Sequence, residues 1–122
     1  MFNWADFLTL ATTLVANGED EAALRSAVSR SYYANYNSAL ARLITEGQME
    51  RTDPTQPGKH KFVWDLYRTS FDRRRSQIGI DGDRLRKSRQ DSDYNNNSTV
   101  TQTGASAAVT KAARLYAAIS RL

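Results

Sequence analysis

Cysteine is absent from this 122-residue chain, and histidine occurs once, at His60. The lack of cysteine excludes disulfides, thiolate nucleophiles and Cys-ligated zinc together. A single histidine leaves little to bind a metal ion, so the sequence predicts no metal site and no cofactor. The chain also lacks a Gly-rich phosphate loop followed by Lys and Ser or Thr, a His-Glu-x-x-His helix and a Ser elbow flanked by glycines. The common signatures of nucleotide hydrolases, metalloproteases and serine hydrolases are therefore missing.

Long apolar runs are missing as well. No segment approaches the roughly 20 residues needed to cross a bilayer, and the amino terminus lacks a basic start followed by a long apolar core. We therefore expect a cytoplasmic protein without a membrane partner. Hydrophobic residues make up 40% of the chain and charged residues 25%, which is typical of a globular protein. A chain of this length suffices for one core but not for two, so we predict a single domain over residues 1–122.

Apolar residues recur at intervals of three and four along most of the chain, and no segment is convincing as a strand. This pattern predicts an all-α fold of about five helices. The expected helices cover residues 3–16, with Asn3 and Asp6 as a capping pair, then 19–46, 59–76 and 82–93, and a last helix that Thr101 or Thr103 caps and that ends near Leu122. Two prolines predict a loop at 48–58.

Other expectations follow from the same pattern. The segment 79–82, Gly-Ile-Asp-Gly, is predicted to be the turn before the fourth helix, and the Asn-rich segment 95–98 is predicted to be a loop. The third helix is expected to bury Phe62, Val63, Leu66, Tyr67 and Phe71.

The segment 27–39 combines helical periodicity with polar groups at positions that look buried. Its first stripe continues to Ile44 and contains Arg30, Tyr33 and Asn37. Its second stripe contains Val28, Tyr32, Tyr36, Ala39 and Leu43. Buried polar side chains need hydrogen-bond partners, so Arg30, Tyr33 and Asn37 predict either a structural polar network or a functional pocket.

Two segments carry a resemblance to a known family. Ser29-Arg30-Ser31-Tyr32-Tyr33-Ala34 and the later Leu85-Arg86-Lys87-Ser88-Arg89-Gln90-Asp91-Ser92-Asp93-Tyr94 resemble motifs of the small single-domain HEPN proteins, and Lys59-His60-Lys61 occupies the position of their middle element. The resemblance spans most of the chain. It implies an up-and-down helical bundle, a homodimer, and an RNA-directed role in a toxin–antitoxin or antiviral defence system. If the protein is active, it implies a metal-independent endoribonuclease.

The sequence departs from the HEPN pattern at the residues expected to be catalytic. HEPN ribonucleases typically carry an Arg followed after four to six residues by a His, but here the fifth residue after Arg89 is Tyr94 and the seventh after Arg30 is Asn37. Neither a phenol nor an amide is poised as a general base near neutral pH, so ribonuclease activity should be weak, altered or lost. The candidate catalytic residues are Arg89, Asp93 and Tyr94, which match the second motif, together with His60, the one side chain whose unperturbed pKa lies near neutrality.

Positive charge is concentrated in one part of the sequence. The formal net charge is +4, yet residues 58–90 contain ten basic and four acidic side chains, a local charge of +6. Because guanidinium groups donate paired hydrogen bonds to phosphate and stack on bases, we expect RNA contacts from Arg73, Arg74, Arg75, Arg86 and Lys87. Solvated or Asp-paired arginines are the structural alternative.

Structural roles remain open for the other candidates. Arg30 is expected to pair with Asp91 or Asp93 if the second and fourth helices face each other, and the tyrosines of 32–36 are expected to be core groups. Two functions are therefore predicted from this sequence. One is an RNA-directed HEPN-like protein, and the other is a noncatalytic helical module that binds itself or a partner protein encoded nearby, such as a nucleotidyltransferase.

Overall fold

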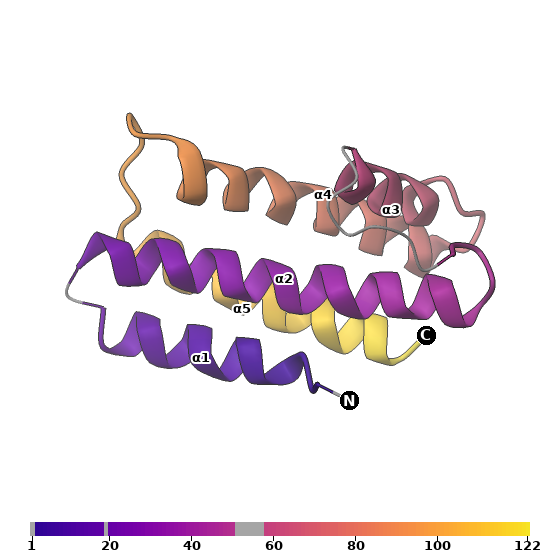
Figure 1. The fold of residues 1–122 in the computed structure, drawn as a ribbon, viewed down its shortest axis with the longest axis horizontal. Helices are drawn as coiled ribbons and strands as arrows, with labels where there is room; N and C mark the ends of the chain where they lie inside the picture. The colour runs from indigo at the N-terminus through magenta and orange to yellow at the C-terminus, as the bar shows by residue number, and fades with distance from the viewer. Residues whose placement is uncertain (1, 19, 51–57) are drawn as a thin grey trace.

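The computed structural model describes residues 2–18, 20–50 and 58–122, and within these ranges it contains five helices and no strand. The helices are α1 (Ala5–Ala16), α2 (Glu21–Thr45), α3 (Lys59–Arg68), α4 (Arg73–Tyr94) and α5 (Gln102–Ser120). They pack side by side as a bundle (Figure 1). The predicted all-α class is therefore confirmed for the described residues. None of these five helices combines the length and the apolar character that a bilayer span requires.

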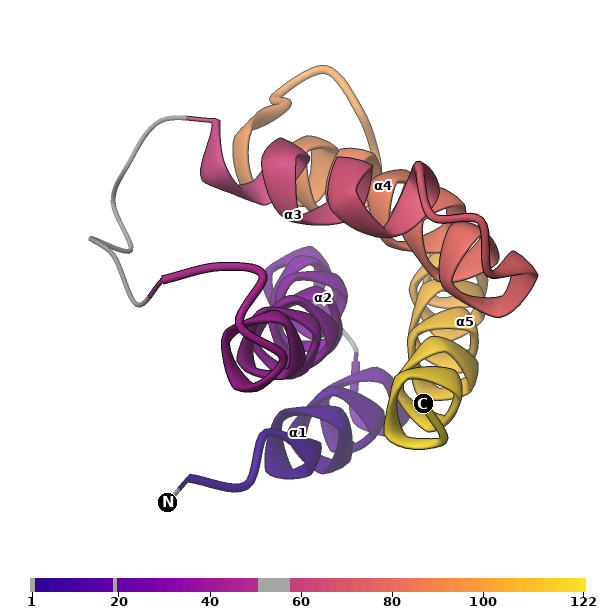
Figure 2. The ribbon, with the colours of Figure 1, turned by 90° about the vertical axis from the view of Figure 1, so that its right-hand side faces the viewer.

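The long helix α2 is the centre of the bundle. Seen end-on, it lies inside an arc formed by α1, α5 and α4, and the short α3 lies along one half of α4 (Figure 2). Helices α1 and α4 run opposite to α2, whereas α5 runs in the same direction as α2 (Figure 1). Residues of α2 therefore contact every other helix, which explains why a single segment of it shows both buried stripes and polar positions.

Aromatic rings form the core where α2 meets α3. Trp64 of α3 is fully buried, and its indole Nε1 donates a 3.0 Å hydrogen bond to the hydroxyl of Tyr32 in α2. The hydroxyl of Tyr67 donates to the carbonyl of Ala39 at 2.8 Å. Each buried ring contributes ~2–3 kcal/mol of hydrophobic stabilisation, and its polar tip is paired. These contacts fix α3 against α2.

The second stripe of α2 is buried as predicted, and the first is not. Val28, Tyr32, Tyr36, Ala39 and Leu43 all lie in the interior. In the first stripe, Tyr33, Asn37 and Ile44 are only half-buried and Arg30 is exposed. The burial expected for the first stripe is therefore wrong, because the faces of α2 that it occupies lie at the margins between neighbouring helices.

Side-chain oxygens accept from first-turn amides at the starts of α1, α2 and α5; the bonds of Asn3 and Thr101 were predicted, and that of Asp20 was not. The Asp20 carboxylate accepts from the amide of Ala23 at 2.7 Å, and the Thr101 hydroxyl accepts from the amide of Gly104 at 3.0 Å. At the start of α1 the Asn3 side chain accepts from the amide of Ala5 at 3.1 Å, but Asp6 forms no reciprocal bond. Each of these bonds satisfies an amide that the first turn of a helix leaves unpaired. The predicted loop at 48–58 lies largely outside the described residues.

The predicted end of the third helix is wrong. Helix α3 stops at Arg68, and α4 begins at Arg73 after Asp72, whose side chain accepts from the amides of Arg74 and Arg75 at 2.8 and 3.4 Å. Phe71 therefore lies in the turn and is fully exposed, rather than buried, and Phe62 is also exposed. Asp72 is a favourable N-cap residue and indicates that a new helix starts at Arg73, but the prediction followed the apolar pattern instead.

The predicted turn at 79–82 is also wrong, because Gly79 and Gly82 lie inside α4. Both glycines face α3 at very short range. A Cβ added to Gly79 would lie 2.3 Å from the backbone nitrogen of Arg68, and one added to Gly82 would lie 2.2 Å from Cε3 of Trp64. These glycines permit close packing of two helices instead of a chain reversal.

Candidate functional site

The side chains predicted to be catalytic lie together where α2, α3 and α4 meet. The ring of His60 from α3 is centred 5.7 Å from that of Tyr32, and Cζ of Arg89 from α4 lies 5.3 Å from the same Tyr32 ring. Nη1 of Arg89 lies 3.6 Å from Oδ2 of Asp93, and Cζ of Arg89 lies 6.0 Å from the ring of Tyr94. We call this group, completed by Tyr33, Tyr36 and Trp64, the Arg89 cluster.

Arg89 is the buried cation of the cluster. Its residue exposure is 7%, and its guanidinium lies over both Tyr32 and Tyr33, 5.5 Å from the latter ring. Asp93 provides the opposing charge and also accepts a 3.3 Å hydrogen bond from the hydroxyl of Ser29 in α2. Nε of Arg89 has no hydrogen-bond partner among the described residues. A buried charge of this kind depends on its carboxylate and on the negative faces of the rings.

His60 is held as a neutral imidazole. Its Nδ1 lies 2.8 Å from the hydroxyl of Tyr32, which already accepts from Trp64. We assign the tautomer in which Tyr32 donates to Nδ1, so that the imidazole proton resides on Nε2. The ring also stacks on Tyr36 at a centroid distance of 3.8 Å. Burial, reinforced by the positive charges of Arg89, Arg86 and Lys59, lowers the pKa of His60 to about 4.

The phenols of the cluster are weaker acids than usual. Burial raises the pKa of Tyr36 to about 12, and burial raises the pKa of Tyr32 even though its hydrogen bond with Trp64 and the charge of Arg89 act in the opposite direction. Both therefore remain protonated at neutral pH. The hydroxyl of Tyr36 has no hydrogen-bond partner among the described residues.

At pH 7 the cluster thus offers one buried cation, one carboxylate, protonated phenols and an imidazole that is already neutral. Such an imidazole has lost the proton that a general acid donates, and its Nδ1 is engaged by Tyr32. Acid–base catalysis works best when the pKa lies near the operating pH. The geometry brings the predicted catalytic residues together, and the electrostatics of the cluster favour packing over proton transfer.

Tyr94 is where the cluster reaches the surface. It is the last residue of α4 and is 74% exposed. Beside it lies an open hollow of about 510 Å³, lined by Gln90, Asp91, Tyr94 and the predicted loop residues at 95–97. This hollow lies at the end of α4 opposite to Phe71.

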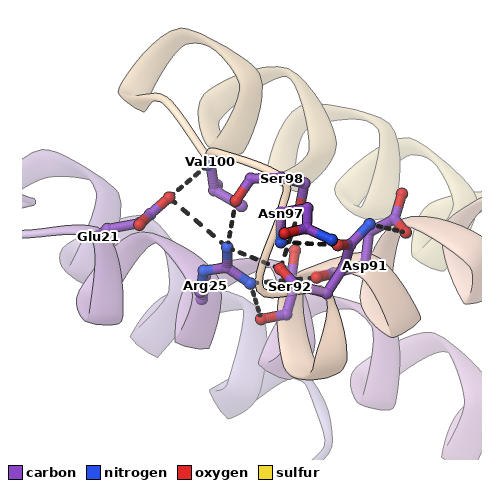
Figure 3. Close-up of polar contacts among 8 residues, drawn as sticks. Glu21, Arg25, Asp91, Ser92, Asn97, Ser98 and Val100 are labelled. Carbon is purple, nitrogen blue, oxygen red and sulfur yellow. Dashed lines mark hydrogen bonds and ion pairs between the residues drawn. The ribbon is translucent and has the colours of Figure 1, made fainter.

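Arg25 holds this end of α4 in place, and sequence reasoning missed it. Its guanidinium donates to the carbonyls of Asp91 and Ser92 at 3.1 and 2.9 Å, and to those of Asn95 and Ser98 at 3.2 and 2.6 Å. Figure 3 shows Arg25 reaching from α2 into the segment that follows α4. We call this arrangement the Arg25 clasp.

Glu21 completes the clasp from one turn earlier in α2. Its Oε1 lies 3.6 Å from Nη2 of Arg25 and accepts from the amide of Val100 at 2.7 Å, as Figure 3 also shows. A cation beside the unpaired carbonyls of a helix C-terminus is favourable. The clasp therefore positions Asp93 and Tyr94 relative to α2.

The residues assigned to a structural polar network do not form one. Arg30 does not pair with Asp91 or Asp93, but lies exposed with its Cζ 5.3 Å from the ring centre of Phe7 in α1. Asn37 donates to the carbonyl of Tyr33 within α2 at 2.8 Å. Tyr33 belongs to the Arg89 cluster instead. The expected ion pair of Arg30 with Asp91 or Asp93 is therefore wrong, because Arg30 points toward Phe7 of α1.

Some of the residues predicted to bind RNA are exposed, and others are largely covered and form ion pairs. Arg73 and Arg74 are exposed, and Arg74 has only a 3.5 Å contact with Asp72. Arg75 forms an ion pair with Glu46 and lies over the ring of Tyr67, so it joins α4 to the end of α2.

The other two predicted contacts share one carboxylate. Nε of Arg86 lies 2.9 Å from Asp83, which is also 3.3 Å from Nζ of Lys87. Burial alone would raise the pKa of Asp83, but hydrogen bonds from Arg86 and Lys87 outweigh it and hold that pKa below its usual range. Arg86 is largely covered, whereas Lys87 is exposed.

Within the part of the chain that the structure describes, no three His, Asp or Glu side chains gather as a possible metal site. Comparisons of the chain with protein-family models, with curated proteins and with solved structures give no match. Function must therefore be argued from the residues and their geometry.

Proposed function

We propose that this protein binds single-stranded RNA along the outer face of α4 and that it does not cleave RNA through His60. The observation that carries the proposal is Phe71, a fully exposed aromatic ring in the turn before α4. It is followed directly by a helix whose first turn exposes Arg73 and Arg74. An aromatic face beside arginines is the arrangement on which bases stack while phosphates pair.

Exposed cations continue along α4 from this turn. Arg73, Arg84, Lys87 and Tyr94 are all exposed, and the intervals between them are close to whole numbers of helical turns. They therefore form one stripe, which we call the α4 stripe. The stripe runs for about 32 Å at the helical rise of 1.5 Å per residue. Aromatic rings lie at both ends, Phe71 before Arg73 and Tyr94 at the end of the helix. Both rings are available for stacking.

Binding without sequence-specific cleavage fits the state of His60. Cleavage by attack of a 2′-hydroxyl needs a base and an acid at the reacting atoms, and His60 is stacked on Tyr36 and bonded to Tyr32. Arg89 is occupied by Asp93 and the tyrosine rings. The proposal therefore treats the Arg89 cluster as the support for α4 and not as the reaction centre.

The family, the biological role and the oligomeric state are part of the same proposal. Five packed helices and the order of the Ser29 to Ala34 and Leu85 to Tyr94 segments support a HEPN-like relationship. On that basis we propose a role in a toxin–antitoxin or defence system in the cytoplasm, with a homodimer as the functional form. The absent Arg–His pair supports a binding function within such a system.

A binding assay tests the proposal. A fluorescein-labelled 12-nucleotide polyuridine RNA is titrated with the protein at 50 and 200 mM salt, and fluorescence anisotropy is measured. Phe71→Ser should weaken binding about tenfold or more, because stacking contributes ~1–3 kcal/mol per base. Leu10→Ser, which removes an exposed apolar side chain from α1, is the control and should have no effect.

Charge variants test the path of the RNA. Arg73→Ala should reduce the slope of log K against log salt by about 0.7, the value for one phosphate of a single strand. Asp91→Asn, which removes a negative charge from the exposed surface near Tyr94, should strengthen binding. No binding at 50 mM salt, or equal affinities for Phe71→Ser and the unchanged protein, would refute the proposed function.

A further inference from the structure

We propose that the groove between α4 and α5 docks an acidic amphipathic helix of a partner protein. The groove encloses about 320 Å³ and is distinct from the Arg89 cluster. Leu85, Leu115 and Ala118 provide its apolar lining, and Arg84, Lys111 and Arg114 provide its cations. An apolar strip bordered by one sign of charge is the complement of an amphipathic helix with the opposite charge.

A second hollow extends the groove along α5. It measures about 580 Å³ and shares Lys111 and Arg114 with the first. Apart from Gln102, its remaining lining on α5 consists of short side chains, including Ser106, Ala107 and Thr110, and its other wall is formed by Val15 and Ala16 of α1. Short side chains let another helix approach closely, and the two hollows together follow α5 for about four turns. The surface therefore has the length and the shape to accept a helix.

The charge of this surface selects an acidic partner. Lys111 and Arg114 are exposed and form no ion pair with any described residue. Among the described residues, Asp81 is the one carboxylate that lines the groove; it lies 3.9 Å from Arg84 and accepts a hydrogen bond from Gln77. The groove consequently presents an excess of positive charge that the protein itself does not neutralise.

The same facts disfavour two other occupants. A second copy that used the same face would bring Lys111 and Arg114 toward their own equivalents, which is a like-charge contact. Single-stranded RNA gains most from aromatic platforms, and the groove is lined by none. Its apolar floor instead suits the leucine side chains of a peptide.

Two synthetic peptides provide the test. One is an 18-residue fluorescein-labelled helix with leucine on one face and glutamate on the other, and the second has lysine in place of every glutamate. We expect the acidic peptide to bind at least tenfold more tightly than the basic peptide. Arg114→Glu and Lys111→Glu should each weaken the acidic peptide at least tenfold.

Arg121, which directly follows α5, provides a charge-matched control. Arg121→Glu makes the same change of charge at an exposed residue outside the groove, and should change the affinity less than twofold. Backbone amide shifts in an NMR titration should move at 106–118 and not at the start of α3. Phe71→Ser should leave peptide binding unchanged, which separates this proposal from the RNA proposal.

Each contrary outcome overturns the inference. Equal binding of both peptides, or equal losses for Arg114→Glu and Arg121→Glu, would show that general charge attraction accounts for binding. Concentration-dependent dimerisation that Arg114→Glu abolishes would assign the groove to a second copy. Loss of RNA binding in Arg114→Glu without any peptide binding would assign it to RNA.

Discussion

Replacing Gly79 by alanine sets two physical effects against each other. In the interior of an exposed helix this change stabilises a protein by about 1 kcal/mol, because alanine has the higher helix propensity. In α4, however, the new Cβ would lie 2.3 Å from the backbone nitrogen of Arg68 and 2.7 Å from its Cα. The close packing of α4 against α3 predicts destabilisation, whereas a glycine in an open turn would tolerate the change.

The magnitude follows from the atoms that must move. Ordinary contacts of a Cβ begin at 3.4 Å, so α3 and α4 must separate locally by about 1 Å to accommodate alanine. Overpacking typically costs ~1–3 kcal/mol, and the upper end applies because the opposing atoms belong to the backbone. After the gain in propensity is subtracted, we expect a net loss of about 2 kcal/mol. For a chain of this size that loss lowers Tm by about 8 °C.

Thermal and urea unfolding monitored by far-UV circular dichroism measure this change. Gly104→Ala is the matched control, because Gly104 lies exposed in the first turn of α5, where a Cβ would meet only the Thr101 side chain at 3.2 Å. Its stability should change by less than about 0.5 kcal/mol. A Tm for Gly79→Ala equal to or above that of the unchanged protein would refute the close approach of α3 and α4.

Two further predictions concern the support and the charge state of the Arg89 cluster. Arg25→Met should destabilise the protein by about 2 kcal/mol and speed amide hydrogen exchange at 92–98, because four carbonyls lose a charged donor; unchanged exchange there would contradict the clasp. The depressed pKa of His60, about 4 against about 6.5 in the unfolded chain, means that the unfolded chain binds its proton first as the pH falls. Stability should therefore decline between pH 6.5 and 4, and His60→Gln should lessen that decline; an NMR titration that places the pKa of His60 above 6 would contradict this.

Helix boundaries were predictable where a polar cap coincided with a change in periodicity. Thr101 caps α5 as predicted, whereas the cap that Asp20 forms on α2 was not predicted. The boundary between α3 and α4 was predicted wrongly, because glycines were read as a turn. The property that matters at Gly79 is its distance from Arg68, and this distance depends on how two helices cross. The spacing of residues within one segment of the sequence gives no information about this distance.

The site was predictable to the same limited degree. Motif order grouped Arg89, Asp93 and Tyr94, and His60 was predicted separately from its unperturbed pKa. In the structure Arg89 and His60 both lie beside the ring of Tyr32. The role of Arg25 was not predictable, because its partners are backbone carbonyls, which every residue has. Charge counting likewise grouped Arg73, Arg74 and Arg75, although Arg75 is committed to Glu46.

Residues whose spacing suggests an active site are here the residues that join three helices. The tyrosine rings of α2 receive a guanidinium from α4 and an imidazole from α3, and these contacts require one cation and one neutral ring. Burial disfavours the charged form of His60, and the nearby positive charge of Arg89 adds to this effect, so the pKa of His60 is low. The arrangement that stabilises the bundle is therefore the arrangement that keeps His60 from exchanging protons near pH 7. A motif match alone does not distinguish packing from catalysis, and an NMR titration of the His60 imidazole is the measurement that separates the two roles.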